Sequence, residues 1–166
     1  MTTSTHTTNP NPAALRHAFG ALPTGVALIA AELDGQPMGM LASSLATISL
    51  EPPLVQISFD RFSTTWPRLR AAPRAGISVL SADNQKDVAL LRRPTARRFD
   101  AVPMTRHPGG ALTLPNAIST YLVAPYEDID AGDHVTRLFT ILETSRRPDA
   151  EPLVFYNSAI APLRRG

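Results

Sequence analysis

The chain has 166 residues, with 16 basic against 14 acidic side chains and a formal net charge of +2. A chain of this size buries roughly two thirds of its unfolded surface, so it suits one domain with its own core. The absence of cysteine excludes disulfides, thiolate nucleophiles and cysteine-based metal sites, and the low net charge argues against a duplex nucleic-acid-binding domain.

The N-terminal segment, residues 1–12, is predicted to be a disordered tail, because residues 1–9 are rich in Thr and Asn and offer almost nothing to bury. This segment has neither the basic nor the apolar region of a secretory signal. No later run reaches the roughly 18 apolar residues of a membrane span. We therefore expect a cytoplasmic protein without membrane contact, in which residues 13–166 form a single domain.

A helix is expected near the start of this domain. Asn11 is a suitable N-cap and Pro12 suits the first helical position, whereas Pro23 ends the helical pattern. Apolar residues follow at helical spacing and are expected to face a core. They are Leu15, Ala18, Phe19 and Leu22.

Runs of apolar or alternating residues predict β-strands over most of the remaining chain. Asp34-Gly35 predicts a hairpin turn between the first two strands. An acidic turn through Glu127, Asp128 and Asp130 is expected between the fifth and the sixth. The predicted strands are residues 25–33, 36–42, 54–59, 75–80, 117–123, 135–142 and 153–156.

Helical segments are few in the rest of the sequence. Residues 63–70 suit a short helix that directs Trp66 and Leu69 inward, and residues 85–93 suit an amphipathic helix. Residues 103–115 are expected to be a loop. Short strands joined by turns favour a mainly β fold with a few helices, as an antiparallel sheet or barrel, over a parallel array.

Classical catalytic patterns are absent from the sequence. The four histidines stand singly, so we expect no metal site. No Gly-x-Ser-x-Gly elbow surrounds Ser43, and no Gly-x-Gly-x-x-Gly follows a first strand. The chain therefore suits a reaction whose chemistry comes from bound cofactors, with the protein supplying geometry and electrostatics.

A run of small and hydroxyl residues, residues 39–44, closes the second predicted strand. Such a run lets backbone amides and the hydroxyls of Ser43 and Ser44 approach a flat ligand, although a tightly packed strand end would look the same. Because Lys86 is the only lysine, the basic residues are nearly all arginine, which binds phosphate bidentately. The arginines within residues 92–98 form either a solvated helix end or a clamp for a nucleotide phosphate.

Four short motifs occur in order along the chain: Leu-Pro-Thr-Gly-Val at residues 22–26, Gly-Met-Leu-Ala-Ser-Ser at 39–44, Glu-Pro-Pro-Leu-Val at 51–55 and Gly-Asp-His at 132–134. With them, the chain from residue 15 to residue 163 resembles the short-chain flavin reductase family. That resemblance implies a homodimeric FMN-binding split β-barrel of Greek-key type. It also implies an NAD(P)H-dependent flavin oxidoreductase, which passes a hydride from NADH or NADPH to FMN or FAD and supplies a separate flavin-dependent monooxygenase.

The resemblance also implies the site residues. His134 is the catalytic candidate, placed near the nicotinamide to orient the dinucleotide. Residues 39–44 would lie against the flavin ring, where amides and hydroxyls would stabilise developing negative charge. Residues from 58 to 65 would line the ribityl and phosphate path. The complete cofactor-binding set is Pro23, Thr24, Gly39, Met40, Leu41, Ala42, Ser43, Ser44, Ser58, Asp60, Arg61, Ser63, Thr65 and Arg98.

Some positions depart from the family pattern. Leu41 stands where threonine is usual, and Asp60 where asparagine is frequent. These departures leave two alternatives open: a split barrel that binds flavin or another cofactor without reductase turnover, and a flavin-bound oxidoreductase that acts directly on an organic substrate. If flavin binds, we expect the backbone amide of Leu41 to be needed for polar contact and its side chain not to be needed for polar contact.

Overall fold

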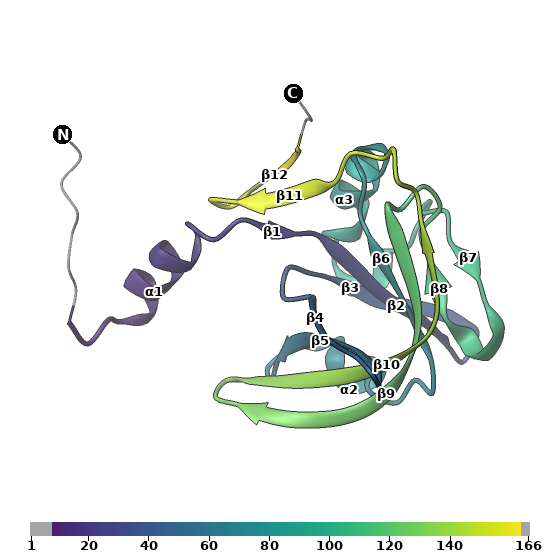
Figure 1. Ribbon diagram of the computed structural model, residues 1–166, viewed down its shortest axis with the longest axis horizontal. Helices are drawn as coiled ribbons and strands as arrows, with labels where there is room; N and C mark the ends of the chain where they lie inside the picture. Colours follow the sequence, from purple (N-terminus) through teal and green to yellow (C-terminus); the bar gives the residue numbers. More distant parts are fainter. Residues whose placement is uncertain (1–7, 164–166) are drawn as a thin grey trace.

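The computed structural model describes residues 8–163. Its body is an antiparallel seven-stranded sheet with strand order β3-β2-β6-β9-β10-β5-β4 (Figure 1). In chain order, the strands of this sheet are β2 (Ala27–Leu33), β3 (Gln36–Ala42), β4 (Ala46–Leu50), β5 (Pro53–Asp60), β6 (Ala75–Val79), β9 (Ser119–Ala131) and β10 (His134–Arg146). The mainly β fold class expected from the sequence is confirmed.

The sheet is strongly curled, because its two edge strands are joined by a short link. β3 ends at Ala42 and β4 begins at Ala46, and such a connection spans at most about 14 Å. The Ser44 hydroxyl within this link accepts a hydrogen bond from the Ser58 amide of β5 at 3.0 Å and donates to the Ser58 carbonyl at 3.2 Å. The link therefore extends the pairing of β4 with β5 and holds the edge of β3 nearby.

Smaller elements surround this sheet. A three-stranded sheet has the order β1-β11-β12, and β7 pairs with β8. The helices are α1, α2 and α3, with short 3₁₀ turns η1 to η3 between strands. Their bounds are β1 (Thr24–Gly25), β7 (Thr105–Arg106), β8 (Leu112–Thr113), β11 (Leu153–Tyr156), β12 (Ala159–Pro162), α1 (Pro12–Phe19), α2 (Trp66–Leu69), α3 (Gln85–Leu91), η1 (Ala82–Asn84), η2 (Thr95–Arg97) and η3 (Pro108–Gly110).

Strand β2 is buried on both faces and separates two apolar cores. Successive side chains of a strand point to opposite faces, so Ile29 packs with the core inside the curl, together with Phe59 and Trp66. Leu28 packs with the other core, which lies against α3 and β11 and includes Leu91 and Leu153. The second core fixes α3 and the small sheet beside the free edge of β3.

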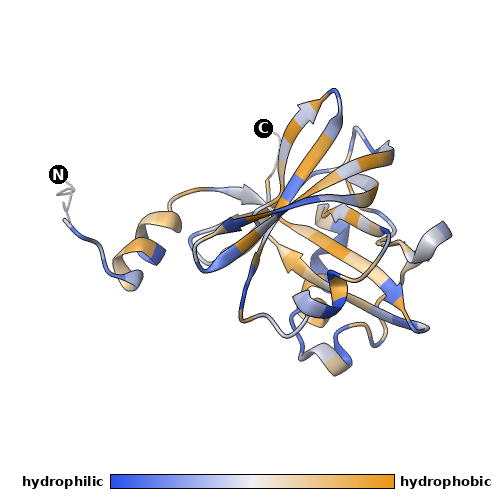
Figure 2. Ribbon diagram, turned by 90° about the horizontal axis from the view of Figure 1, so that it is seen from below, coloured by the Kyte–Doolittle hydropathy of each residue, from blue (hydrophilic) through white to orange (hydrophobic). Residues whose placement is uncertain are grey.

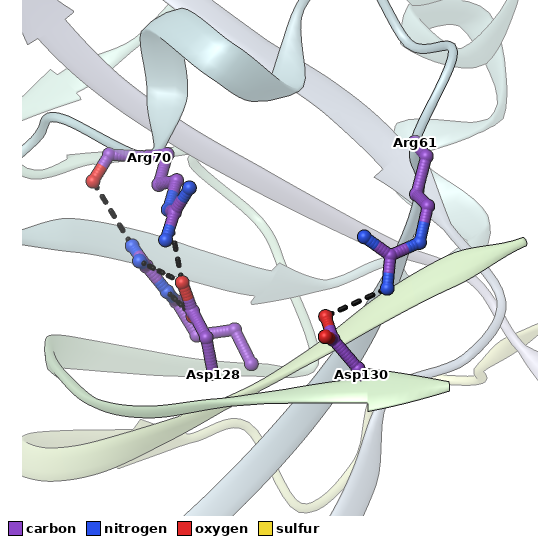
Figure 3. A network of polar contacts seen from close by, with 5 residues as sticks. Arg61, Arg70, Asp128 and Asp130 are labelled. Carbon is purple, nitrogen blue, oxygen red and sulfur yellow. Dashed lines mark hydrogen bonds and ion pairs between the residues drawn. The ribbon is translucent and has the colours of Figure 1, made fainter. Parts of the chain in front are cut away.

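An ion pair between the buried Arg137 and the half-buried Asp128 supports the core inside the curl (Figure 3). The Arg137 guanidinium donates to both carboxylate oxygens of Asp128, and its Nη1 donates to the Arg70 carbonyl at 3.0 Å. It also lies 4.7 Å from the centre of the Trp66 ring, which stacks on Phe59 at 3.9 Å. Hydrogen bonds from Arg137 hold the pKa of Asp128 below its usual range, with a smaller contribution from Arg70.

The expected acidic turn at residues 127–130 is wrong. β9 and β10 run for 13 residues each, and Asp128 lies opposite Arg137 inside the ladder. The chain reverses instead at Gly132, whose φ of +64° suits glycine. The acidic run is typical of a turn, and the sequence alone does not show that Arg137 lies across the strand pair and neutralises Asp128.

The helix α1 was predicted correctly, but its expected burial is wrong. The Asn11 side chain accepts a hydrogen bond from the Ala14 amide at 2.9 Å, so the cap is confirmed. No residue of the helix is buried; Phe19 is 68% exposed, and Leu22 just beyond it is 66% exposed. Figures 1 and 2 show why, since α1 projects away from the rest of the chain and meets no core.

Several other expectations about secondary structure are corrected or confirmed. The region 103–115, expected to be a loop, contains the short strands β7 and β8, and two strands that were not expected, β4 and β12, are present. The inward positions of Trp66 and Leu69 and the hairpin at Asp34-Gly35 are confirmed. Residues 1–7 of the predicted tail lie outside the described residues.

Replacing Asp128 with asparagine is expected to destabilise the protein by about 1–3 kcal/mol at pH 7, because it leaves the buried Arg137 charge without its partner. Since folding lowers the pKa of Asp128, its contribution is complete above the unfolded pKa of about 4 and is lost as the pH falls below it. Urea unfolding at pH 7 and near pH 3 measures both effects. Asp130→Asn, in an exposed pair, should cost under about 1 kcal/mol; equal losses for the two variants would contradict the assignment.

Candidate active site

The edge of β3 that faces away from β2 carries unpaired backbone groups. The Leu80 amide donates a hydrogen bond to the Val26 carbonyl. The backbone N–H and C=O groups of Val26, and of every second residue after it in β2, therefore point toward β6. Leu28, opposite Leu41, is one of these, and Leu41 consequently points its N–H and C=O away from β2. β3 is the last strand in the sheet order, so no strand within residues 8–163 pairs with this edge.

Two other residues of β3 support this alternation. Gly39 lies two residues before Leu41, so its backbone N–H and C=O point to the same side of β3. Its carbonyl accepts a hydrogen bond at 2.7 Å from Arg98, which lies outside the sheet. Pro37 lies a further two residues before Gly39 and has no N–H. Proline fits this position of an edge strand because its nitrogen faces away from the neighbouring strand β2. The amide of Leu41 is therefore available to a ligand.

A cavity of about 200 Å³ lies against this edge. β3 and the link after it provide one wall, the end of α3 provides another, and the β11–β12 hairpin covers the far side. The lining residues are Val26, Leu41, Ala42, Ser43, Arg92, Phe155 and Ile160. The cavity brings together three of the residues expected to contact the flavin ring, Leu41, Ala42 and Ser43.

Four of the lining residues lie outside the predicted set of site residues: Val26, Arg92, Phe155 and Ile160. Phe155 and Ile160 lie opposite each other in the β11–β12 hairpin, whose second strand was not expected. A signal for that hairpin existed, because Asn157 and Ser158 favour a turn between two apolar runs. The sequence presents Arg92 as one of the arginines within residues 92–98, which form either a solvated helix end or a clamp for a nucleotide phosphate.

The side chains around Leu41 serve packing. Leu41 itself packs against the core beside α3, whereas Met40 and Ala42 pack against the core inside the curl. At Gly39 a Cβ atom would lie 2.3 Å from the Ile29 carbonyl oxygen, so glycine is required there by the strand pairing itself. Close packing explains Gly39 without any ligand.

Arg98 holds the β3 edge in place from the side of α2. Its Nη1 donates to the Gly39 carbonyl at 2.7 Å and to the Thr65 hydroxyl at 3.2 Å. Burial lowers the pKa of Arg98. Its Nε and the Thr24 hydroxyl are buried and have no hydrogen-bond partner among the described residues. Polar groups without partners are costly in a protein interior, so each suits a position beside a polar ligand.

The remaining predicted residues lie at the end of β5 and serve local structure. The Ser58 hydroxyl bonds the Thr136 hydroxyl at 2.8 Å, and an Asp60 carboxylate oxygen accepts from the Phe62 amide at 2.7 Å. The Ser63 hydroxyl accepts from the amides of residues 65 and 66 and so caps α2. Pro23 is exposed beside β1.

Arg61 and His134 both lie near the β9–β10 turn, where each bonds to residues of the turn or of the strand before it. Arg61 donates to an Asp130 carboxylate oxygen at 2.6 Å, visible in Figure 3, and to the Gly132 carbonyl at 3.0 Å. His134 lies opposite Asp60 in the ladder, and its Nδ1 is 2.7 Å from an Asp133 carboxylate oxygen. The His134 hydrogen bond is the main cause that lowers the pKa of Asp133.

The site described above consists of backbone groups, hydroxyls and arginines around an apolar cavity. Residues 8–163 contain no cluster of three or more His, Asp or Glu side chains suited to hold a metal ion. None of the helices in this range is both long and apolar enough to span a membrane.

Comparison with known proteins assigns the chain to a family. Residues 19–164 match the model of the flavin reductase like domain. FMN reductase (NADH) SmoA of Agrobacterium fabrum is 32% identical over 155 residues, which are 93% of this chain and 88% of SmoA. The structure of NADH:FAD oxidoreductase SgcE6 of Streptomyces globisporus superposes with a TM-score of 0.90 at 27% identity and covers 99% of this chain and all of that one.

This chain therefore belongs to the flavin reductase like domain family, and the resemblance noted in the sequence is confirmed. The reductase subunit Stc3 of stachydrine N-demethylase from Rhizobium meliloti is 37% identical over 127 residues, which are 75% of this chain. The chain spans only 55% of the length of Stc3 and 40% of a second relative from the same organism.

Leu41→Pro is expected to abolish or greatly weaken flavin binding with little loss of folded structure. The substitution removes an N–H that faces away from β2, and an edge strand tolerates proline at such a position. Leu41→Val, which keeps the N–H and an apolar side chain, should bind flavin like the unmodified protein. Flavin fluorescence titration measures binding, and circular dichroism checks the fold. Equal affinity of folded Leu41→Pro and Leu41→Val would refute the role of this amide.

Proposed function

We propose that this protein is an NAD(P)H-dependent flavin reductase, which transfers a hydride from NADH or NADPH to FMN or FAD and releases reduced flavin to a separate monooxygenase. The observation that carries the proposal is the outward Leu41 amide beside an apolar cavity, in a chain of the flavin reductase like domain family. The names of SmoA and SgcE6 include NADH, with FMN in one and FAD in the other, which favours NADH as the donor and leaves both flavins as substrates.

The residues present suit a flavin. Bound flavin and nicotinamide supply the hydride chemistry themselves. The chain contributes the Leu41 N–H and the Ser43 hydroxyl as donors, which can stabilise negative charge at a ring edge placed beside them. Val26, Phe155 and Ile160 give the same cavity apolar walls, which suit the faces of a flavin ring.

His134 is proposed to orient the dinucleotide. Its exposed ring is held at Nδ1 by Asp133, so Nε2 remains available to a ligand at the open end of β5 and β10. Hydride transfer requires no base, so His134 acts through position and not by removing a proton. Arg61, though paired with Asp130, lies at the same end and is retained as a proposed contact of the flavin phosphate.

We further propose a homodimer formed through α1. The helix and the segment after it expose Phe19 and Leu22 by about two thirds each, while Leu15 is 36% exposed. A projecting helix with no buried residue gains nothing from the core of its own chain, whereas a second copy can cover its apolar side chains.

A separate acceptor is proposed because reduced flavin must be used after it leaves the reductase. The relative Stc3 is named as the reductase subunit of stachydrine N-demethylase. We place the protein in the cytoplasm, since the sequence has no cysteine to oxidise and the proposed nicotinamide donor belongs to that compartment.

Purified protein is expected to oxidise NADH under anaerobic conditions only when FMN or FAD is added. Loss of nicotinamide absorbance measures the rate for each donor and flavin. His134→Ala should raise the KM for NADH more than it lowers kcat, because the histidine orients the dinucleotide and removes no proton. Flavin retention without NADH or NADPH oxidation would instead identify a binding protein, and product formed from an organic substrate without a partner would identify a direct oxidoreductase.

Combined Phe19→Asp and Leu22→Asp substitutions should convert the dimer into a folded monomer, because two carboxylates would be buried at the interface. Light scattering after size-exclusion chromatography gives the mass. Leu50→Asp is the matched control, since Leu50 is 95% exposed but lies on β4. A monomeric unmodified protein, or dissociation caused by Leu50→Asp and not by the double substitution, would overturn this interface.

A further inference from the structure

Arg92 is a cation without a partner at the mouth of the cavity. α3 ends at Leu91, and the Arg92 amide bonds the Val88 carbonyl at 3.1 Å, so the helix end fixes where its side chain begins. The exposed guanidinium lines the cavity and makes no hydrogen bond or ion pair with any residue from 8 to 163. Its position beside residues 41–43 places a positive charge next to the outward edge of β3.

The other arginines near the site are already engaged or lie elsewhere. Arg98 donates to the Gly39 carbonyl and the Thr65 hydroxyl, and Arg97 pairs with Asp100 at 3.5 Å. Arg61 is held by Asp130 at 2.6 Å. A phosphate bound by Arg61 would compete with this carboxylate, whereas a phosphate at Arg92 displaces no protein partner.

The chemistry of the cavity matches a nucleotide. The side chains of Val26, Phe155 and Ile160 suit the faces of a planar ring, and one guanidinium suits an anionic group attached to that ring. An apolar ligand would leave Arg92 without an electrostatic role, and a free inorganic anion would leave the apolar walls unused.

We propose that Arg92 is a phosphate anchor of this site, additional to the proposed contact at Arg61, and a specificity-determining residue that selects phosphorylated over unphosphorylated nucleotide ligands. The inference rests on the proposed function and adds to it a residue that binds a phosphate of the nucleotide. The phosphate belongs either to the flavin or to the adenylate part of the dinucleotide, and the same guanidinium chemistry serves both.

The test measures binding by calorimetry without any reductant, using two matched pairs of ligands: FMN with riboflavin, and AMP with adenosine. Each pair differs only by a phosphate. Arg92→Ala should weaken the phosphorylated member of one pair about tenfold or more and leave the unphosphorylated member unchanged, since a charge-assisted hydrogen bond is lost. Arg92→Lys should recover part of the loss. Arg93→Ala is the matched control, because Arg93 is the exposed neighbour that does not line the cavity.

The affected pair identifies the source of the phosphate, flavin or adenylate. The wild-type preference for that phosphorylated ligand should also weaken with added salt, and this salt dependence should be smaller in Arg92→Ala. Unchanged affinities for both FMN and AMP in Arg92→Ala, or equal losses in Arg93→Ala, would overturn the inference even if the protein reduces flavin. Failure to oxidise NADH with any flavin would overturn the proposed function. The binding measurements on Arg92→Ala could still be interpreted, because they use no reductant.

Discussion

The site depends on β3 having a strand partner on one side only. The short link from β3 to β4 forces the sheet to curl, and Ser44 joins that link to β5 by hydrogen bonds to both backbone groups of Ser58. The curl brings the two edges of the sheet near each other without pairing them. Unpaired edges are usually a liability because they invite another strand. Here Arg98 donates a hydrogen bond to the Gly39 carbonyl. The outward N–H and C=O of Leu41 have no such partner within residues 8–163 and can bind a ligand.

Rigidity on both sides of this edge makes it usable as a site. Inside the curl, Phe59, Trp66 and Arg137 stack in sequence, and Asp128 neutralises the buried guanidinium. On the other side, the second core seats α3 and the β11–β12 hairpin against β2. Donors held in place before a ligand arrives lose little freedom on binding, which is how a protein without a catalytic side-chain constellation can still favour one ligand geometry.

Much of the fold could be predicted because its signals are local. Alternating apolar residues, the Asp34-Gly35 turn and the Asn11 cap each act within a few residues, and each is present in the structure. The errors concern contacts between different secondary-structure elements. Asp128 resembled a turn residue because its neutralising Arg137 lies on another strand, and Phe19 was expected in a core that α1 does not reach.

The site was predictable to a similar extent. Residues 41–43, which the family resemblance assigns to the flavin ring, line the cavity, but the sequence pattern could not show which hydrogen-bond donors the fold itself uses. Ser63 caps a helix, Arg98 braces a strand edge, and Arg61 pairs with Asp130. Arg92 and Phe155 reach the cavity only through the packing of α3 and β11, which no local motif reports.

The central claim is that the outward amide of Leu41 contacts the flavin. Titration of ¹⁵N-labelled protein with oxidised FMN, followed by amide resonances, tests it most directly. The account predicts that the Leu41 amide shifts strongly, while those of Met40 and Ala42, which are bonded to β2, shift less. Shifts centred instead on the separate cavity beside Lys86 and Val102, with Leu41 unmoved, would contradict it.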